Sequence, residues 1–508
     1  KYQIMFNVTE QPAWLDELSE DAKRRLSRNN DLLTEGKNDV IISPAMKDVE
    51  DSEIEEFVRD TFNSGKYTEY LISMEESNLD KLGPRSIAAP WVDRRSDLQS
   101  YFTDIPTVTR EEFASLAREM AREHSIDRRL HPVDLSTAVD SLESSTNSGL
   151  PYLQKKGIVR KNGQADERWV DVFPVVVFTR TQEGGKTRNV MGYGISDVIR
   201  EMRYHRTFLP LEQTYSWRAA IVSPEATDLA ITRMFARKSR GIVSCLDFSA
   251  YDASITPDHS GKAFAFIAAH FASKFEDEIF DIYLRFATIP FYTPDGEYSG
   301  NHGVPSGSAF TNTIDSIVQY LIISDTIGRP DADSVQIQGD DSIFTVTGGE
   351  NDAIVEAFTR DGLTVNTEKS DQFEDEEGTY LQRYYHPDYR GHGTNLGGVY
   401  CIARALLRLK YLERFVDGLG TEEELTGDDY FALRAITILE NCKHHPHFHD
   451  LIDFTRLRDK HQLNFSREGL KVYENLPERR SRVDVTNQYG DRGGIESFQT
   501  FQYLKATA

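Results

Sequence analysis

The chain has 508 residues, of which 39% are hydrophobic and 11% aromatic, and its net charge is −24. This composition excludes a disordered or fibrous protein, and no run of about eighteen apolar residues predicts a membrane span. Three scattered cysteines, Cys245, Cys401 and Cys442, argue against a disulfide framework or a cysteine zinc site, so we expect a reducing, intracellular setting.

The acidic balance argues against a protein that coats nucleic acid with its outer surface. Residues 151–210 differ from the rest, because they carry eleven Lys or Arg against six Asp or Glu, a local charge of +5. We expect either an internal basic path for a polyanion or solvated helix faces of mixed charge in this region.

The first half of the chain contains few chemical signals. Residues 1–140 predict mostly helices and loops without a catalytic motif, which indicates a supporting scaffold. Short apolar runs at 173–178 and 241–247 predict strands, and the apolar spacing over 253–290 predicts helix.

The second half contains a predicted hairpin and a predicted helix. Residues 335–346 read as strand, tight turn and strand around Gly339. Residues 400–416 predict an amphipathic helix. The last forty residues, rich in Arg, Asn, Gln and Gly, predict an extended or loosely held tail.

Three aspartates follow or interrupt the predicted strands. Asp247 closes the first of these strands, Asp340 lies in the turn of the hairpin, and Asp341 comes next. If the strands are neighbours, these carboxylates converge and can hold two Mg²⁺ ions about 3.5–4 Å apart, with Asp341 the weaker ligand. The sequence leaves open whether Mn²⁺ takes the place of Mg²⁺. Taken alone, Gly-Asp-Asp is a turn signal and indicates a plain hairpin.

The sugar of a nucleotide has candidate ligands nearby. Asp252 lies five residues after Asp247, so the chain must bend between them for both to face one site. Asp252 would then accept a hydrogen bond from a ribose 2′-hydroxyl, although a plain helix-starting aspartate is the alternative. After the turn at Ser306, Thr311 and Asp315 are four residues apart and share one face of a predicted helix.

Cationic side chains complete the candidate site. Arg180, Lys186 and Arg188 flank two glycines, and a bent cationic segment is suited to binding a triphosphate. Lys369 can protonate a leaving pyrophosphate or is an ordinary surface lysine.

Two further features are ambiguous. Arg404 and Arg408 share one face of the 400–416 helix, where they would hold an RNA backbone or lie on a solvated face. Residues 444–449 contain four histidines, but no second cluster or cysteine pair near them favours a metal.

These segments, in this order, resemble the RNA-dependent RNA polymerases of viruses, most closely those of double-stranded RNA viruses of the picobirnavirus type, with partitivirus polymerases next. The resemblance covers roughly residues 145–415. In the family, equivalents of Ser148, Gly149 and Pro151 meet the template RNA. The other matching segments are the nucleotide-binding Arg180–Arg188, the metal motif Asp247–Asp252, the ribose and template motif Ser306–Asp315 with Gly307, the catalytic hairpin Gly339–Asp341, the primer-grip hairpin Tyr380–Tyr384, and the general acid Lys369.

The resemblance implies an α+β fold of the closed right-hand type, with fingers, palm and thumb around an RNA tunnel. The palm would be an antiparallel sheet with helices on one face. We expect the N-terminal region and fingers at 1–240, the palm at 241–399 with a fingers insertion at about 256–300, and the thumb and C-terminal tail at 400–508.

The implied function is template-directed RNA synthesis by two-metal nucleotidyl transfer, in replication and transcription of a double-stranded RNA genome. The implied partners are template and product RNA, ribonucleoside triphosphates and capsid protein, with no membrane. The implied setting is a monomer in the virion interior and the host cytoplasm. Two alternatives are a reverse transcriptase, which usually has a bulky aromatic residue near the sugar, and an inactive RNA-binding component of a particle.

One residue departs from the positive-strand virus pattern, in which an asparagine stands at position 315. Asp252 and Asp315 cannot both be charged at contact distance. They therefore lie apart, or a donor such as Asn312 or Ser306 intervenes, or one of them is protonated.

Overall fold

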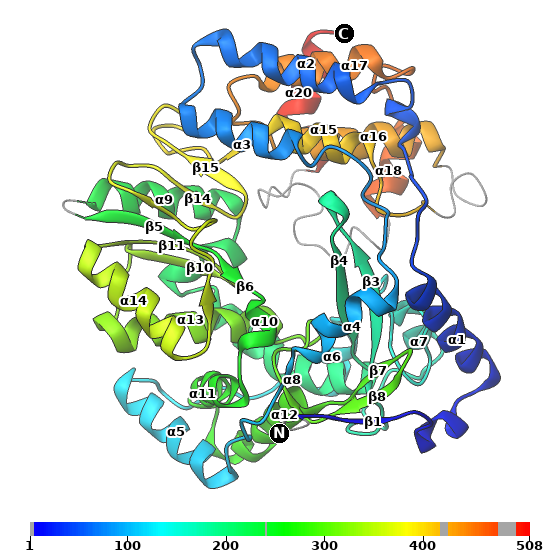
Figure 1. Cartoon of the computed structure of the whole chain (residues 1–508), viewed down its shortest axis with the longest axis vertical. Coiled ribbons are helices and arrows are strands. Elements are labelled where there is room, and N and C mark those ends of the chain that lie inside the picture. The colour runs from blue at the N-terminus through cyan, green and yellow to red at the C-terminus, as the bar shows by residue number, and fades with distance from the viewer. Residues whose placement is uncertain (1–4, 239–240, 417–424, 476–493) are drawn as a thin grey trace.

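The structure is a computed structural model that describes residues 5–238, 241–416, 425–475 and 494–508. Its elements form three groups arranged as a ring, one at the left, one at the lower right and one at the top, where two helices from near the N-terminus lie beside the C-terminal helices (Figure 1). They correspond to the fingers, palm and thumb of a right hand. None of the helices in these residues is both long and apolar enough to cross a membrane.

A four-stranded antiparallel sheet, in the order β10–β11–β5–β13, forms the palm. Its strands are β5 (Ile242–Leu246), β10 (Val335–Gln338), β11 (Asp341–Val346) and β13 (Asp371–Phe373). Alternate residues point to opposite faces, so Leu246 and Phe344 enter one core while Val243, Cys245 and Ile343 enter another. The strands expected at 241–247 and 335–346 are therefore confirmed.

Helices cover one face of this sheet, as expected. They are α11 (Pro257–Ala268), α13 (Thr311–Ile327) and α14 (Gly348–Arg360). The other face is also covered, by α9 (Pro224–Arg237) and by the strands β14 (Gly378–Tyr380), β15 (Arg383–Tyr385) and β16 (Val399–Tyr400). Both faces of the sheet are buried because apolar side chains occupy both sets of alternating positions along the strands.

A five-stranded sheet, in the order β1–β8–β7–β3–β4, forms the fingers. Its strands are β1 (Asn7–Thr9), β3 (Val175–Thr181), β4 (Thr187–Gly192), β7 (Phe291–Thr293) and β8 (Gly296–Ser299). It packs on α1 (Glu20–Glu35), α4 (Trp91–Gln99), α6 (Leu135–Asp140), α7 (Lys156–Lys161) and α8 (Ile195–Glu212). The strand expected at 173–178 is β3, which begins two residues later.

Further elements join fingers and palm. Helices α5 (Arg110–Glu123) and α12 (Glu276–Thr288) pack on α11, and α10 (Tyr251–Ser254) precedes it. Two short strand pairs are β2 (Phe102–Thr103) with β9 (Asn301–His302) and β6 (Phe248–Ser249) with β12 (Thr364–Val365). The helix expected over 253–290 is thus divided, because a turn at 269–275 redirects the chain.

The thumb is helical. It contains α15 (Ile402–Lys410), α16 (Gly427–Glu440), α17 (Phe448–Arg458), α18 (Arg467–Asn475) and α20 (Gln499–Ala506). The helix expected over 400–416 ends at Lys410, because Tyr411 is extended and bridges to Ile42.

Two N-terminal helices belong to the thumb by packing. Ile54 and Val58 of α2 (Asp51–Thr61), with Leu79 of α3 (Glu69–Leu79), share a core with α15–α17. Part of the expected N-terminal region and fingers at 1–240 thus packs with the thumb helices. The amphipathic faces of α2 and α3 find their apolar partner about 350 residues further along the chain, so local sequence does not reveal it.

The expected extended tail is wrong for the last described residues. Helix α20 packs through Tyr503 and Leu504 on the thumb core, and Gln499 donates its backbone N–H to Glu440 at 2.9 Å. The first residues of the predicted tail, 469–475, are also helical, as part of α18, and residues 476–493 lie outside the described residues.

Candidate active site

The three predicted metal ligands meet at one edge of the palm sheet. Asp247 directly follows β5, Asp340 lies at the tip of the β10–β11 turn, and Asp341 begins β11. Because Leu246 pairs with Ser342 across the sheet, Asp247 and Asp341 are brought side by side. Desolvation raises the pKa of Asp341 to about 7, and the charges of Asp340 and Asp247 add to the rise.

Asp341 is also held by the hairpin predicted to be the primer grip. Its Oδ2 accepts a hydrogen bond of 2.9 Å from the backbone N–H of Leu381, in the turn between β14 and β15. The described part of the chain contains no group of three or more His, Cys, Asp or Glu arranged to hold a metal ion by themselves. The residues still fit divalent ions, because the carboxyls carry raised pKa values and Mg²⁺ commonly takes one or two carboxylates plus substrate phosphates.

The bend predicted before Asp252 is present. Ala250 has φ 48° and ψ 50°, a left-handed conformation that turns the chain into α10. Asp252 reaches Asp315 of α13, and burial, followed by the charge of Asp252 and a hydrogen bond to it, raises the pKa of Asp315 well above its usual value. Of the arrangements expected from sequence, this raised pKa favours the third, in which one carboxyl of the pair takes a proton.

The loop before α13 is locked to strand β4 of the fingers. Ser306 Oγ accepts from the Met191 N–H at 3.0 Å, and Thr311 Oγ1 donates to the Pro305 carbonyl at 2.7 Å. A Cβ on Gly307 would lie 1.7 Å from the Met191 carbonyl oxygen, so only glycine fits there. Ser306 and Thr311, predicted as nucleotide ligands, therefore use their hydroxyls to shape the loop.

The β3–β4 hairpin carries the predicted triphosphate ligands above the carboxylates. Arg180 pairs with Arg188 across the hairpin, so both side chains share one face. Desolvation raises the pKa of Asp340, and the positive charge of Arg188 opposes that rise. Desolvation also raises the pKa of Asp247, and the positive charge of Lys186 opposes it. In the residues that the structure covers, the three cationic side chains form no hydrogen bond or ion pair. They are therefore available to an anionic ligand.

Lys369 lies in a turn tied to Asp247. The Asp247 carbonyl accepts from the Asn366 N–H at 2.7 Å, and the Asp247 N–H donates to Ser370 Oγ at 2.9 Å. Lys369 is exposed, and its charge opposes the desolvation that raises the pKa of Asp247. The structure thus brings the predicted general acid to the predicted metal ligand.

The predicted template contacts at 148–151 are less accessible. Ser148 is 0% exposed and its hydroxyl accepts from the Gln154 N–H at 3.2 Å. Gly149 has φ +61°, and a Cβ there would lie 2.3 Å from the Tyr193 carbonyl oxygen. Pro151, after a cis peptide bond, is half-buried. Ser148 and Gly149 therefore serve the packing of this loop, and the predicted RNA contact at 148–151 stays a prediction.

The two thumb arginines close the ring. Arg404 forms an ion pair of 3.1 Å with Glu183 at the tip of the β3–β4 hairpin and donates to Gln382 Oε1 at 2.7 Å. Arg408 donates to the Tyr400 hydroxyl at 3.2 Å. The solvated-face alternative is wrong for both, because these half-buried side chains bind protein groups. The Glu183–Arg404 pair joins fingers to thumb, as the closed form requires.

Sequence reasoning missed the polar groups that support the site. Ser316 Oγ accepts from the Gly339 N–H at 2.8 Å, and Gln319 Nε2 donates to the Gly339 carbonyl at 2.7 Å. Glu201 of α8 accepts from Ser308 Oγ at 2.6 Å and from the Ala309 N–H at 3.2 Å. The available signal for the contacts to Gly339 was that Ser316 and Gln319 are polar residues three apart on α13.

The histidines at 444–449 serve packing. His445 approaches Glu75 at 3.3 Å with both side chains 0% exposed, and His447 contacts Asp450 at 2.8 Å and Ser64 at 2.8 Å. These contacts tie α3 and the preceding turn to α17.

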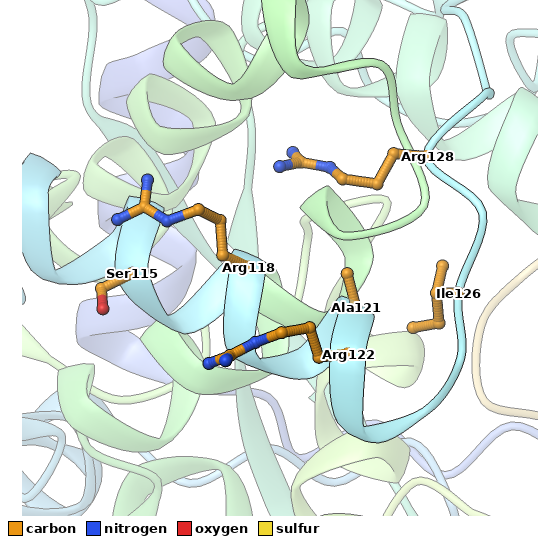
Figure 2. Close-up of a pocket in the computed structure, with 6 residues that line it drawn as sticks. All are labelled: Ser115, Arg118, Ala121, Arg122, Ile126 and Arg128. Atoms are coloured by element: carbon orange, nitrogen blue, oxygen red, sulfur yellow. The ribbon is translucent and has the colours of Figure 1, made fainter.

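A cavity of about 650 Å³ lies away from the palm edge, beside α5 (Figure 2). Figure 2 shows the side chains of Arg118 and Arg122 rising from α5 and that of Arg128 from the following loop. Arg128 is already paired with Glu276 at 2.8 Å. The residues that line the cavity include none of the predicted site residues, so it is separate from the candidate active site.

The ring of fingers, palm and thumb, with carboxylates at the palm edge and cations above them, defines a right-hand polymerase. Residues 66–395 match the family described as viral RNA-dependent RNA polymerase, and the chain belongs to it. It is therefore an RNA-directed RNA polymerase that copies a template.

The resemblance to the picobirnavirus type is confirmed. The chain is 28% identical over 489 residues to a potential RNA-dependent RNA polymerase of a human picobirnavirus (strain Human/Thailand/Hy005102/-), covering 86% of this chain and 88% of the relative. It also matches a crystal structure of the RNA-dependent RNA polymerase of a human picobirnavirus, with TM-score 0.82, 25% identity and coverage of 99% of this chain and 100% of the other. An insertion-loop deletion mutant of that kind of polymerase matches with TM-score 0.81, 26% identity and the same coverage.

Proposed function

We propose that this polymerase adds ribonucleotides by a two-metal nucleotidyl transfer, in the replication and transcription of a double-stranded RNA virus genome. The observation that carries the proposal is the palm edge, where Asp247, Asp340 and Asp341 meet below the unpaired cations of the β3–β4 hairpin. Burial raises the pKa values of these carboxyls, and divalent cations together with a cationic hairpin would stabilise their charged forms.

Each side chain has a distinct task in this mechanism. Asp247 and Asp340, with Asp341 as a third ligand, would hold two Mg²⁺ or Mn²⁺ ions, which stabilise negative charge on the attacking and leaving oxygens. Arg180, Lys186 and Arg188 bind and orient the triphosphate. These six residues act mainly by positioning the triphosphate and by stabilising negative charge in the transition state, and phosphoryl transfer depends on both.

Sugar selection and proton transfer fall to other residues. Asp252 accepts the hydrogen bond of the ribose 2′-hydroxyl, and protonated Asp315 holds it in place. Lys369 donates a proton from Nζ to the leaving pyrophosphate. The loop before α13 is held against β4 by Ser306, Gly307 and Thr311. These contacts fix the position of the sugar site relative to the template path.

The cellular setting is part of the proposal. A viral polymerase with picobirnavirus relatives is expected in the virion interior and in the host cytoplasm, as a monomer beside capsid protein. The RNA tunnel would hold template and product strands, with Arg404 and Arg408 at its thumb side and 148–151 at the side where the template enters.

The test is RNA synthesis by the purified chain on a short single-stranded RNA with four ribonucleotides and Mg²⁺, beside Asp340→Ala. Asp331→Ala, an exposed aspartate before β10, is the matched control. We expect full-length product from the natural chain and the control, and none from Asp340→Ala. Mn²⁺ titration followed by calorimetry should show weaker binding in Asp340→Ala. Equal product or equal ion binding in all three chains would refute the metal site.

A further inference from the structure

A buried ion pair adjoins the catalytic hairpin but lies outside every motif. Arg218, between α8 and α9, is 1% exposed, and its guanidinium lies 3.0 Å from Glu212 Oε1 at the end of α8. Glu212 is equally buried and accepts from Thr313 Oγ1 at 3.1 Å. A buried ion pair costs desolvation energy and often gives little net stability, so its position deserves a functional explanation.

The other guanidinium donors of Arg218 join helix α13 to strand β10. Nη1 shares its two hydrogens among three acceptors, Ser316 Oγ at 2.9 Å, the Ile337 carbonyl at 3.0 Å and Gln338 Oε1 at 2.6 Å. Nη2 donates to Asn312 Oδ1 at 2.7 Å. A planar guanidinium with five fixed donors can make these contacts together, whereas a lysine ammonium cannot.

The hydroxyl of Ser316 passes this constraint to the catalytic turn. Its proton is donated to the Asn312 carbonyl at 2.7 Å, so both lone pairs must act as acceptors. One accepts from Arg218 and the other from the Gly339 N–H at 2.8 Å. Gln319 holds the Gly339 carbonyl at 2.7 Å, so both backbone polar groups of the glycine before Asp340 are bound to α13.

From this geometry we infer that Arg218 is a positioning residue, which sets the Gly339–Asp340 turn relative to α13 through Ser316. It touches neither substrate nor metal ligand. Because α13 carries Asp315, the same contact holds the metal-binding turn in register with the sugar site. The inference rests on the function proposed above for Asp340.

The test separates positioning from stability with four full-length variants. Arg218→Met leaves Glu212 as an unpaired buried charge, whereas Arg218→Met combined with Glu212→Gln removes both charges. Ser316→Ala removes the hydroxyl that links Arg218 to the turn and leaves the Arg218–Glu212 ion pair in place. The control combines Arg285→Met with Asp197→Asn, an ion pair of 3.1 Å in the fingers.

Three experiments are done on each chain. The first gives the melting temperature, the second gives kcat and KM for a ribonucleotide on a primed template, and the third gives the deuterium uptake of residues 335–346 without metal. Arg218→Met should lower the melting temperature, and the double variant with Glu212→Gln should recover most of the loss. The kcat of the double variant should stay about ten- to a hundred-fold below that of the natural chain, and its KM should stay within about three-fold of the natural value. The reason is that a small misplacement of catalytic groups acts on rate rather than on binding. Uptake at 335–346 should be faster in both, and Ser316→Ala should reproduce the kcat loss.

The inference is overturned if the double variant or Ser316→Ala keeps the kcat and the slow uptake of the control pair. If the double variant does not fold, Ser316→Ala decides alone. If the natural chain has no RNA-synthesis activity, or if Asp340→Ala is as active as the natural chain, the proposed metal site is refuted instead. Deuterium uptake at 335–346 needs neither metal nor substrate, so it still tests Arg218 in that case.

Discussion

The carboxyl of Glu201 makes a sharp test of how burial acts on the loop before α13. It is 3% exposed, and burial, its largest perturbation, raises its pKa from 4.5 to about 7. The folded chain therefore binds more protons than the unfolded chain between these values, so the stability that this group contributes falls as pH rises from about 4.5 to 7. The full shift corresponds to about 3 kcal/mol of unfolding free energy.

Glu201→Gln removes the titration and keeps the contacts. A glutamine carbonyl can accept the Ala309 N–H while its amide donates to Ser308 Oγ. Between pH 5 and pH 8 the natural chain should lose about 2.5 kcal/mol more unfolding free energy than the variant. For 508 residues unfolding together, with an unfolding entropy of about 1.1 kcal/mol per kelvin, this equals about 2 °C in melting temperature.

The assay is thermal melting of both chains at pH 5 and pH 8, with exposed Glu119→Gln as control. The natural chain and the control should show the same loss between the two pH values, and Glu201→Gln a smaller one. Glu201→Ala, which leaves Ser308 Oγ and the Ala309 N–H without their acceptor, should lower stability at both pH values by about 1–3 kcal/mol for each group and reduce RNA synthesis. An identical pH dependence in the natural chain and Glu201→Gln would refute the reasoning.

Three further outcomes are expected in RNA synthesis assays. Gly307→Ala should abolish activity, because its Cβ would meet the Met191 carbonyl at 1.7 Å, and normal activity would contradict that contact. Asp315→Asn keeps a neutral donor and should retain ribonucleotide kcat/KM within about three-fold, whereas Asp252→Ala should lose about ten- to a hundred-fold of the preference for ribonucleotides over deoxyribonucleotides. Lys369→Leu should lower kcat about a hundred-fold with unchanged RNA affinity, and a change under about three-fold would exclude its role as an acid.

Local sequence was sufficient for the chemistry of the palm edge. The strand ending at Asp247, the hairpin around Gly339 and the bend before Asp252 each depend on residues within about six positions of one another. Backbone geometry over such a span follows from side-chain periodicity and turn residues, so the pattern predicts it. The order of these segments was likewise enough to indicate the family.

The partners of α2 and α3 and the role of Arg404 could not be predicted in this way. Amphipathic helices and surface arginines have many chemically acceptable neighbours. Which one they meet depends on contacts between segments hundreds of residues apart, as in the ion pair of Arg404 with Glu183 at 3.1 Å. The ring that this pair closes is therefore a property of the folded chain.

The sequence by itself determined which groups are proposed to carry the chemistry, since Asp247, Asp340 and Lys369 are residue types suited to it and stand in the order of the family's motifs. Only the tertiary structure decided the burial that raises the pKa of Asp315 and the contacts of Arg218 with the turn before Asp340. The physical reason is that a pKa and a buried hydrogen-bond network depend on desolvation and on neighbours in space, and neither is encoded in the spacing of residues along the chain.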